Sequence, residues 1–412
     1  MDKQNSRFRW VVFASVLFTY ILMSSQRTAP GLITDQVMLD FSVTATTIGL
    51  LTSIQFFVYT GLQIPMGLLA DRFGPNFFLI IGAFLTGIGT IIYSLGTHEL
   101  VLFVARILTG IGDATIWVNM VLILSLWFNA KEFTRLIGVA AMTGSLGFIL
   151  ATFPFAILIA KLGWRVAFFS IGLLLCLCGL LLYIVLVKKP NQPVFSKLEI
   201  QREKTFVLLK RIFSNRQAWA LFMCHFGIVG TYVGFISSWG VPYGMTVYGM
   251  TRSDASLLIM LGLIGALIGA PLAGWISSRL EMIKRPYIVV HLLLLFSWSI
   301  FLFFFGNPPF VLLITLFFII GVSYGANALT FAAVRQSFPI KESGIVSGFA
   351  NTGGFLSAVL LPSFFGKVLD FFEVSGNLNA GYHYGFIIPV IFSIVGLIGV
   401  LLIKDKWEVQ EG

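Results

Sequence analysis

The stretches FNAKE at residues 128–132 and FPIKE at residues 338–342 decide the fold, because each is a charged turn set within strongly apolar sequence. In both copies a glycine follows six residues after the glutamate, at Gly138 and at Gly348. A charged turn repeated between apolar spans predicts two copies of one membrane bundle. Duplicated bundles place a site at the interface between the copies, which is the architecture of a transporter.

The composition agrees with a membrane protein. Of the 412 residues, 58% are hydrophobic and 11% are charged, and the mean hydropathy is +0.94. We expect an all-α membrane protein with twelve transmembrane helices in two pseudo-symmetric six-helix bundles around a central cavity. The expected spans are 10–32, 44–68, 77–96, 100–127, 134–160, 166–187, 217–241, 254–277, 286–306, 309–334, 343–368 and 384–404.

The longest polar interval separates six spans from six. It predicts an N-terminal bundle over residues 1–187, a cytoplasmic linker over 188–216 and a C-terminal bundle over 217–412. The linker holds eight basic and two acidic residues. Apolar residues at helical spacing between 206 and 213 predict an amphipathic helix within it.

Basic residues predict the orientation. With both termini on the cytoplasmic side, that side collects 21 of the 27 Lys and Arg residues. The formal charge of +10 is then an orientation and lipid-headgroup signal, and no nucleic-acid partner is needed to explain it. The basic N-terminus could pass for a secretory signal, but no small-residue cleavage site follows, so we interpret it as an uncleaved first span.

Several functional classes lack their signatures. Cys176, Cys178 and Cys224 fall inside expected spans and lack metal-ligand spacing, so we expect no metal site and no disulfide. Neither a phosphate-binding G-x-x-x-x-G-K-[ST] loop nor an H-E-x-x-H motif occurs. We therefore expect no enzyme activity and no cofactor.

The sequence GLLADRFGPN at residues 67–76 resembles the G-x-x-x-D-R-x-G-x-R/K signature between helices 2 and 3 of the major facilitator superfamily, although Asn76 replaces the basic residue. GWISSR at 274–279 keeps the glycine and the arginine of that signature. RILTGIG at 106–112 is similar to the family's helix 4 pattern, and its glycine pair aligns with GVS at 321–323. The resemblance covers the whole chain and implies the fold of that superfamily.

Such turns suit a gate. Asp71 at a helix end can pair with a basic side chain in one conformation and release it in another. The expected gating residues are Gly67, Asp71, Arg72, Gly74 and Arg279. The alternative is a turn kept only for insertion topology.

Other features are similar to the anion:cation symporter subfamily. They are Arg27 in the first span, Tyr59 with Gln63-x-Pro65 in the second, and Trp127-Phe128 before the turn. The Gly-Pro-rich motif of drug:proton antiporters is absent from helix 5. The resemblance implies uptake of organic anions, commonly with protons.

Three charged residues fall well inside the spans, namely Arg27, Arg106 and Asp113. A charge at the bilayer centre costs at least about 2.5–3.5 kcal/mol on insertion scales, so such residues are functional candidates. Tyr20, Ser24 and Arg27, with Gly31 beyond them, would share one face of a continuous first helix. Because a guanidinium suits carboxylate or phosphate, we expect Arg27 to bind the anion, with Tyr20 and Ser24 beside it. Arg27 could instead snorkel to the outer interface.

On helix 4, Arg106, Gly110, Asp113 and Trp117 share a face, and Arg106 and Asp113 lie about 10 Å apart along the axis. Asp113 is the only carboxylate deep in any expected span. It could bind a proton during transport, with Arg106 tuning it. A permanent ion pair between the two residues is an equal alternative.

Polar and aromatic residues on other spans suggest a cavity wall. Each of them could also be ordinary packing. The expected substrate contacts are Tyr59 and Gln63 on helix 2, Tyr232 and Trp239 on helix 7, and Tyr324 and Asn327 on helix 10.

The sequence therefore predicts a monomeric, proton-coupled symporter of a small organic anion in a lipid bilayer, specifically a bacterial inner membrane. A close variant transports zwitterions such as amino acids, with Arg27 holding the carboxylate and Asp113 the ammonium. The other class, a polytopic receptor or enzyme without transport, has no supporting motif.

Overall fold

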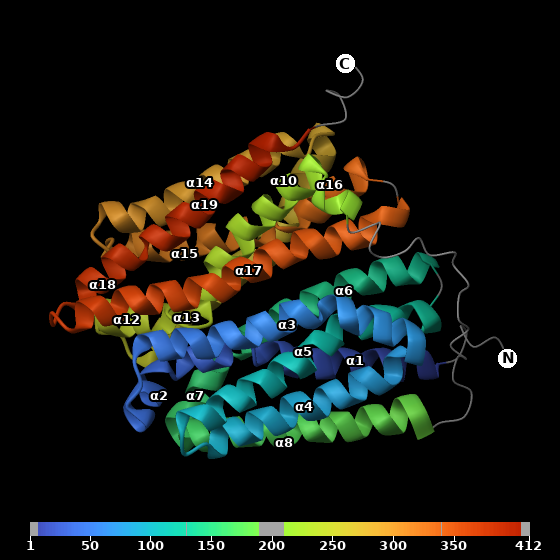
Figure 1. Cartoon of the computed structure of the whole chain (residues 1–412), viewed down its shortest axis with the longest axis horizontal. Coiled ribbons are helices and arrows are strands. Elements are labelled where there is room, and N and C mark those ends of the chain that lie inside the picture. The colour runs from blue at the N-terminus through green and yellow to red at the C-terminus, as the bar shows by residue number, and fades with distance from the viewer. Residues whose placement is uncertain (1–6, 129, 189–209, 339, 405–412) are drawn as a thin grey trace. The chain divides into compact units, whose positions relative to one another are not determined.

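The computed structural model describes residues 7–128, 130–188, 210–338 and 340–404 (Figure 1). A few side chains beside these gaps and near residue 70 are also outside the description. Every regular element within the described ranges is helical, and twelve helical segments there are long and apolar enough to cross a membrane. The prediction of an all-α protein with twelve spans is confirmed.

The chain divides into two compact units, and helix α3 contributes to both. The first unit consists of residues 1–33 and 54–199, and the second of residues 34–53 and 200–412. The expected division at the linker differs from this one at residues 34–53. Of the helix expected between residues 206 and 213, residues 206–209 lie outside the described residues, and residues 210–213 are helical.

The first unit holds the helices that carry the buried charges. Its elements, with α3 shared, are α1 (Phe8–Ser25), η2 (Ala29–Leu32), α3 (Ala45–Phe73), α4 (Pro75–Leu95), α5 (Glu99–Trp127), α6 (Ala130–Leu150), α7 (Phe153–Leu162), α8 (Trp164–Tyr183) and η3 (Ile184–Lys188).

The second unit begins with a short helix taken from the N-terminal half of the chain. Its elements are α2 (Thr34–Phe41), α10 (Arg216–His225), η4 (Phe226–Gly230), α11 (Thr231–Ile236), α12 (Gly240–Tyr248), α13 (Arg252–Leu280), α14 (Lys284–Phe303), α15 (Phe310–Gly325), α16 (Ala328–Ser337), α17 (Ile340–Glu373), α18 (Leu378–Gly385) and α19 (Ile387–Leu402).

One glycine that repeats in the sequence, Gly110 in the first unit and Gly321 in the second, allows close packing of helices in each unit. A Cβ on Gly110 of α5 would lie 2.9 Å from the carbonyl oxygen of Gln55 on α3. A Cβ on Gly321 of α15 would collide with the carbonyl oxygen of Gly262 on α13. Because glycine has no Cβ, each pair of helices can approach closely, as membrane helices do where small residues meet.

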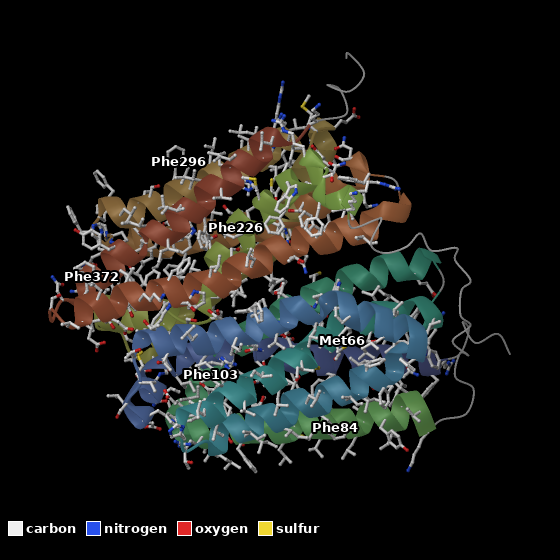
Figure 2. All side chains as sticks on the ribbon, in the orientation of Figure 1. Met66, Phe84, Phe103, Phe226, Phe296 and Phe372 are labelled. Carbon is white, nitrogen blue, oxygen red and sulfur yellow. The ribbon has the colours of Figure 1, made fainter. Side chains whose placement is uncertain are left out.

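Large apolar side chains also cover the outside of the helices. Figure 2 shows Phe296 projecting outward from α14, and 62% of its surface is exposed. Phe226 of η4 packs inward against Phe392, with ring centroids 4.7 Å apart. Apolar residues on both inner and outer faces are expected of helices whose outer surface contacts lipid.

A carboxylate from α17 holds the beginning of α3. Asp370 Oδ1 accepts a hydrogen bond from the backbone N–H of Ala45 at 2.7 Å, and Oδ2 accepts one from Thr46 at 2.9 Å. Nearby, the hydroxyls of Ser53 and Ser363 lie 2.8 Å apart. An acid at a helix N-terminus satisfies free N–H groups and favours the helix dipole. Asp370 therefore fastens this end of α3 to α17.

We predict that Asp370→Ala lowers the free energy of unfolding by about 1–2 kcal/mol, because two N–H groups lose a charged acceptor. Thermal unfolding of the purified protein measures the change. Glu373→Ala removes an exposed acid from the same helix and serves as the matched control. Equal melting temperatures for the two variants would contradict the capping role.

Candidate functional site

The first span stops being an α-helix at Ser25, and Arg27 lies in the turn that follows. The N–H groups of residues 26–28 bond to carbonyls three residues earlier, at 3.1 to 3.3 Å. The short 3₁₀-helix η2 begins at Ala29, with Pro30 in its first turn. Proline cannot donate a backbone hydrogen bond, which favours a break in the helix before it. The single α-helix that was expected to carry Tyr20, Ser24, Arg27 and Gly31 on one face therefore ends before Arg27.

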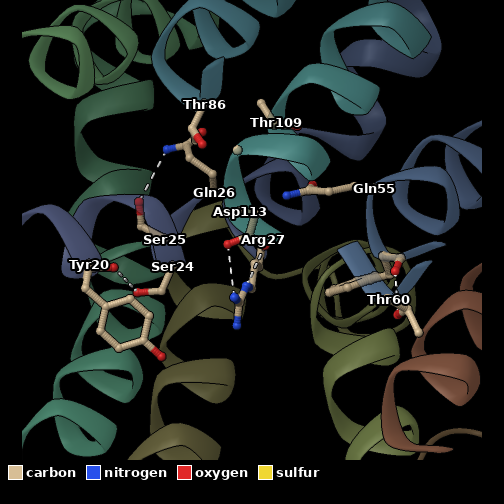
Figure 3. Close-up of polar contacts among 12 residues, drawn as sticks. Tyr20, Ser24, Ser25, Gln26, Arg27, Gln55, Thr60, Thr86, Thr109 and Asp113 are labelled. Atoms are coloured by element: carbon tan, nitrogen blue, oxygen red, sulfur yellow. Dashed lines mark hydrogen bonds and ion pairs between the residues drawn. The ribbon is translucent and has the colours of Figure 1, made fainter. Parts of the chain in front are cut away.

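Arg27 and Asp113 form a bidentate ion pair (Figure 3). Arg27 Nε donates to Asp113 Oδ2 at 2.7 Å, and Nη2 donates to Oδ1 at 3.0 Å. Only 8% of the arginine side chain and 1% of the aspartate side chain are exposed. The parallel fork geometry is the strongest form of an arginine–carboxylate contact.

Tyr59 on α3 forms a wall of this pair. The guanidinium carbon of Arg27 lies 4.6 Å from the centre of the Tyr59 ring, a cation–π contact. Three separate elements thus surround the pair: the turn after α1, the middle of α3 and the middle of α5. Snorkelling of Arg27 to the interface is not what the structure shows, since Arg27 is buried against Asp113.

Arg106 is not the partner of Asp113. Its Nη1 donates to Gln55 Oε1 at 2.7 Å and lies 3.5 Å from the carbonyl oxygen of Gln26. Its guanidinium carbon lies 5.1 Å from the centre of the Tyr93 ring. The structure does not show the alternative of an Arg106–Asp113 ion pair, because Asp113 pairs with Arg27 and Arg106 bonds to Gln55.

The remaining candidates of the first unit differ in whether their polar groups already have hydrogen-bond partners. Tyr20 packs its ring 6.0 Å from Trp117, and its hydroxyl lies close to Gly144. The Ser24 hydroxyl donates to the carbonyl of Tyr20 at 2.8 Å, which leaves it less able to donate to a substrate. Gln63 is half-buried one turn beyond Tyr59, and its Nε2 has no acceptor among the described residues.

The candidates of the second unit form two groups. Tyr232 and Tyr324 pack with ring centres 5.0 Å apart, and Asn327 directly precedes α16. Trp239 is 1% exposed and donates its indole N–H to the carbonyl of Pro362 at 3.0 Å. Because that donor is already used, Trp239 has the surroundings of a core residue.

The expected gating residues are only partly described. The surroundings of Gly67 and the side chains of Asp71 and Arg72 lie outside the description. Gly74 has a φ of +88° directly before α4, a conformation that favours glycine in this turn. Arg279 is exposed in the last turn of α13, 5.5 Å above the Trp275 ring.

Sequence reasoning did not assign to any residue the task of holding the buried arginines in place. Gln26 accepts a hydrogen bond from the Thr90 hydroxyl at 3.2 Å, beside the Arg27 turn. Gln55 and Tyr93 hold Arg106 from α3 and α4. A four-residue spacing from Gln55 to Tyr59 was visible in the sequence, but it did not indicate which arginine each residue would meet.

Known proteins resemble this chain over most of its length. It is 24% identical over 410 residues to "Probable anion transporter 4, chloroplastic" of Oryza sativa subsp. japonica, covering 94% of this chain and 68% of that protein. It is 23% identical over 444 residues to a "Probable hexose phosphate transport protein" of Chlamydia trachomatis, covering 100% of this chain and 93% of that one.

Solved structures show the same fold. A bacterial homolog of the human lysosomal transporter Spinster, in an inward-facing and unoccupied conformation, superposes with a TM-score of 0.78 at 17% identity, covering 97% of this chain and 98% of that one. The family model of the Major Facilitator Superfamily matches residues 13–362. The family predicted from the turn and helix 4 motifs is thereby confirmed. The fold and the relatives indicate a transporter and not an enzyme. The chain belongs to the Major Facilitator Superfamily and is a multi-pass membrane transporter.

Proposed function

We propose that the protein is a proton-coupled symporter of a small organic anion, in which Arg27 pairs alternately with Asp113 and with the transported anion. The observation that carries the proposal is the buried bidentate pair between these two residues. A guanidinium that grips one carboxylate this way has the geometry to grip a carboxylate or phosphate of a substrate.

The buried setting explains why a proton should accompany the anion. An incoming anion that takes Arg27 would leave Asp113 as an unpaired charge, which is costly away from water. Protonation of Asp113 removes that cost and frees the guanidinium. Protonation and anion binding therefore favour each other, and reciprocal coupling of this kind is what symport requires.

The relatives support the anionic substrate class. One is named as a probable anion transporter and another as a probable hexose phosphate transporter. For this chain we propose a small organic anion, carried by a monomer in a bacterial inner membrane. The distribution of basic residues supports cytoplasmic N- and C-termini.

A zwitterion is the second candidate, because the same pair offers one positive and one negative partner. Arg27 would hold its carboxylate while an ionised Asp113 held its ammonium. The two proposals make opposite demands on Asp113, since the anion needs it protonated and the zwitterion needs it charged.

We predict that wild-type anion binding strengthens as pH falls, because a lower pH favours the protonated Asp113 and releases Arg27, and that it weakens as pH rises. Asp113→Asn mimics the protonated state, so its binding should be nearly independent of pH. In proteoliposomes it should keep counterflow exchange but lose accumulation driven by a pH gradient. Full gradient-driven accumulation by Asp113→Asn would rule out this residue as the coupling site, and loss of all binding would favour the zwitterion.

We predict that Arg27→Lys weakens binding by about 10- to 100-fold, because a lysine cannot form the two-pronged contact that is worth about 1.5–3 kcal/mol. Arg27→Ala should abolish uptake. Transport assays on the reconstituted variants measure both effects. Arg165→Lys, a basic residue that bonds the carbonyls of Ser94 and Gly96 instead, is the control. Normal uptake by Arg27→Ala would contradict the proposal that Arg27 binds the anion.

A purely structural ion pair predicts a different pattern of stability. Removing one partner of a buried pair costs about 3–5 kcal/mol, while neutralising both can cost much less. We expect Arg27→Gln to lower the melting temperature more than the double variant Arg27→Gln/Asp113→Asn. If the double variant is stable and still transports the anion against a gradient, the pair is structural and has no part in coupling.

A further inference from the structure

His291 is a fully buried histidine of the second unit. It belongs to α14, which lies beside α19 and near α10 (Figure 1). Gly396 of α19 leaves room for the ring, because a Cβ there would lie 2.9 Å from His291 Cδ2 and 3.1 Å from Nε2. The ring therefore occupies a slot between these helices.

Both ring nitrogens of His291 face a backbone carbonyl oxygen. Nδ1 lies 2.9 Å from the carbonyl oxygen of Tyr287, one turn earlier on α14, and Nε2 lies 3.3 Å from that of Cys224 on α10. A carbonyl oxygen only accepts hydrogen bonds, and a neutral imidazole has one N–H to donate. The neutral ring thus meets one carbonyl with a proton and the other with a lone pair, whereas the charged ring donates to both.

The other buried histidine of the second unit has different partners. His225 Nδ1 lies 3.0 Å from the hydroxyl oxygen of Thr330, which lies 2.6 Å from the hydroxyl oxygen of Tyr287. A hydroxyl can donate to a ring nitrogen or accept from it, so this chain of bonds is complete when His225 is neutral. The contacts of His225 therefore call for no second proton. They also fix Tyr287, whose carbonyl faces His291.

The titratable groups beside the His291 ring come from α14 and α10. They are Tyr287, with ring centres 4.6 Å apart, Cys224 and, through Thr330, His225. Neither α19 nor η4 carries a titratable residue. On α15, Tyr324 packs against Tyr232. Tyr382, His383 and Tyr384 belong to α18, beyond the opposite end of α14.

Charged side chains are found only near the ends of α13 and α14, the two helices of this region that carry them. They are Arg252, Asp254, Arg279, Lys284 and Arg285. The buried residues described in the second unit include no Asp, Glu, Lys or Arg. Burying a charge is costly unless hydrogen bonds replace those it made with water. For a charged His291, the two carbonyl oxygens supply these bonds.

We propose that His291 is a proton-binding residue of the second unit, separate from Asp113, and that its charged ring joins α14 to α10 by donating to the carbonyls of Tyr287 and Cys224. Loss of the proton removes one of these two bonds. Proton binding and the contact between the helices therefore favour each other. The inference does not rest on the proposed function, because neither an anion nor a residue of the first unit takes part.

One labelled sample can report both the proton and the bond. The chain has four histidines and three cysteines, and Cys224–His225 is its only Cys–His pair. The full-length protein, labelled with ¹⁵N-histidine and with ¹³C at the cysteine carbonyls, is reconstituted in lipid bilayers for solid-state NMR. The ring nitrogens report protonation, and the single labelled carbonyl bonded to ¹⁵N is that of Cys224.

Histidine ordinarily changes charge between about pH 5 and pH 8. As the pH falls through this range, we expect the His291 ring to change from one protonated nitrogen to two. The Cys224 carbonyl signal should shift with the same midpoint, because a new N–H bond reaches its oxygen. His291→Gln should lose both changes, since an amide does not titrate. Asp113→Asn should keep both, and His225→Gln, the buried control, should keep the ring titration.

Two protonated nitrogens at every pH, with a Cys224 carbonyl signal that His291→Gln moves, would also support the proposal. A His291 ring that keeps one unprotonated nitrogen throughout overturns it, as does a titration that leaves the Cys224 carbonyl unshifted. If His291→Gln does not fold, the variant His98→Gln/His225→Gln/His383→Gln leaves His291 as the only histidine, and its ring signals decide. Failure of this test would leave the role proposed for Asp113 standing, because Asp113 is tested by accumulation driven by a pH gradient.

Discussion

A charge buried inside a membrane protein is costly unless a partner matches it, and Arg27 and Asp113 meet that need for each other. The pair requires three surrounding elements to lie close together. The turn after α1 turns Arg27 inward, α5 carries Asp113 at its middle, and α3 supplies the Tyr59 ring that covers the guanidinium. Because removal of either charge would strand the other in a low-dielectric setting, the three elements depend on one another. A pair of this kind is costly to break, so a ligand that took one partner would have to replace the lost charge.

The fold was largely predictable because membrane insertion leaves few choices. Lipid cannot satisfy backbone hydrogen bonds, so long apolar segments must be helices, and their number follows from the sequence. The glycines at 110 and 321, which align in the sequence repeat, also have equivalent positions in the structure, since both permit close helix approach. What the sequence did not disclose was where a helix stops within an apolar run. The first span was expected to reach residue 32, but α1 ends at Ser25, before Pro30, and that early end is what places Arg27 beside α5.

The sequence identified which charged residues are buried, but it did not identify the residues that they contact. Arg106 and Asp113 are two helical turns apart, so each points from α5 at a different height in the bundle, about 10 Å from the other. Contacts along one helix can be deduced from spacing, whereas contacts between helices depend on how the bundle packs. Asp113 meets an arginine 86 positions earlier in the chain, and Arg106 meets a glutamine 51 positions earlier. Contacts between residues so far apart in the chain cannot be deduced from a single sequence. Asp370, which caps α3 from 325 positions away, escaped notice for the same reason.

The two arginines of the first unit show how similar residues acquire different roles. Arg27 is matched by the carboxylate of Asp113, and under the proposed function its charge becomes available to a ligand only when that carboxylate binds a proton. Arg106 is matched by an amide oxygen, a backbone carbonyl and an aromatic ring, none of which carries a full negative charge or titrates as an acid near neutral pH. Under the proposed function, the Arg27–Asp113 pair changes its net charge by one unit when Asp113 binds a proton. That single unit of charge is the physical quantity through which a proton gradient could act on an anion.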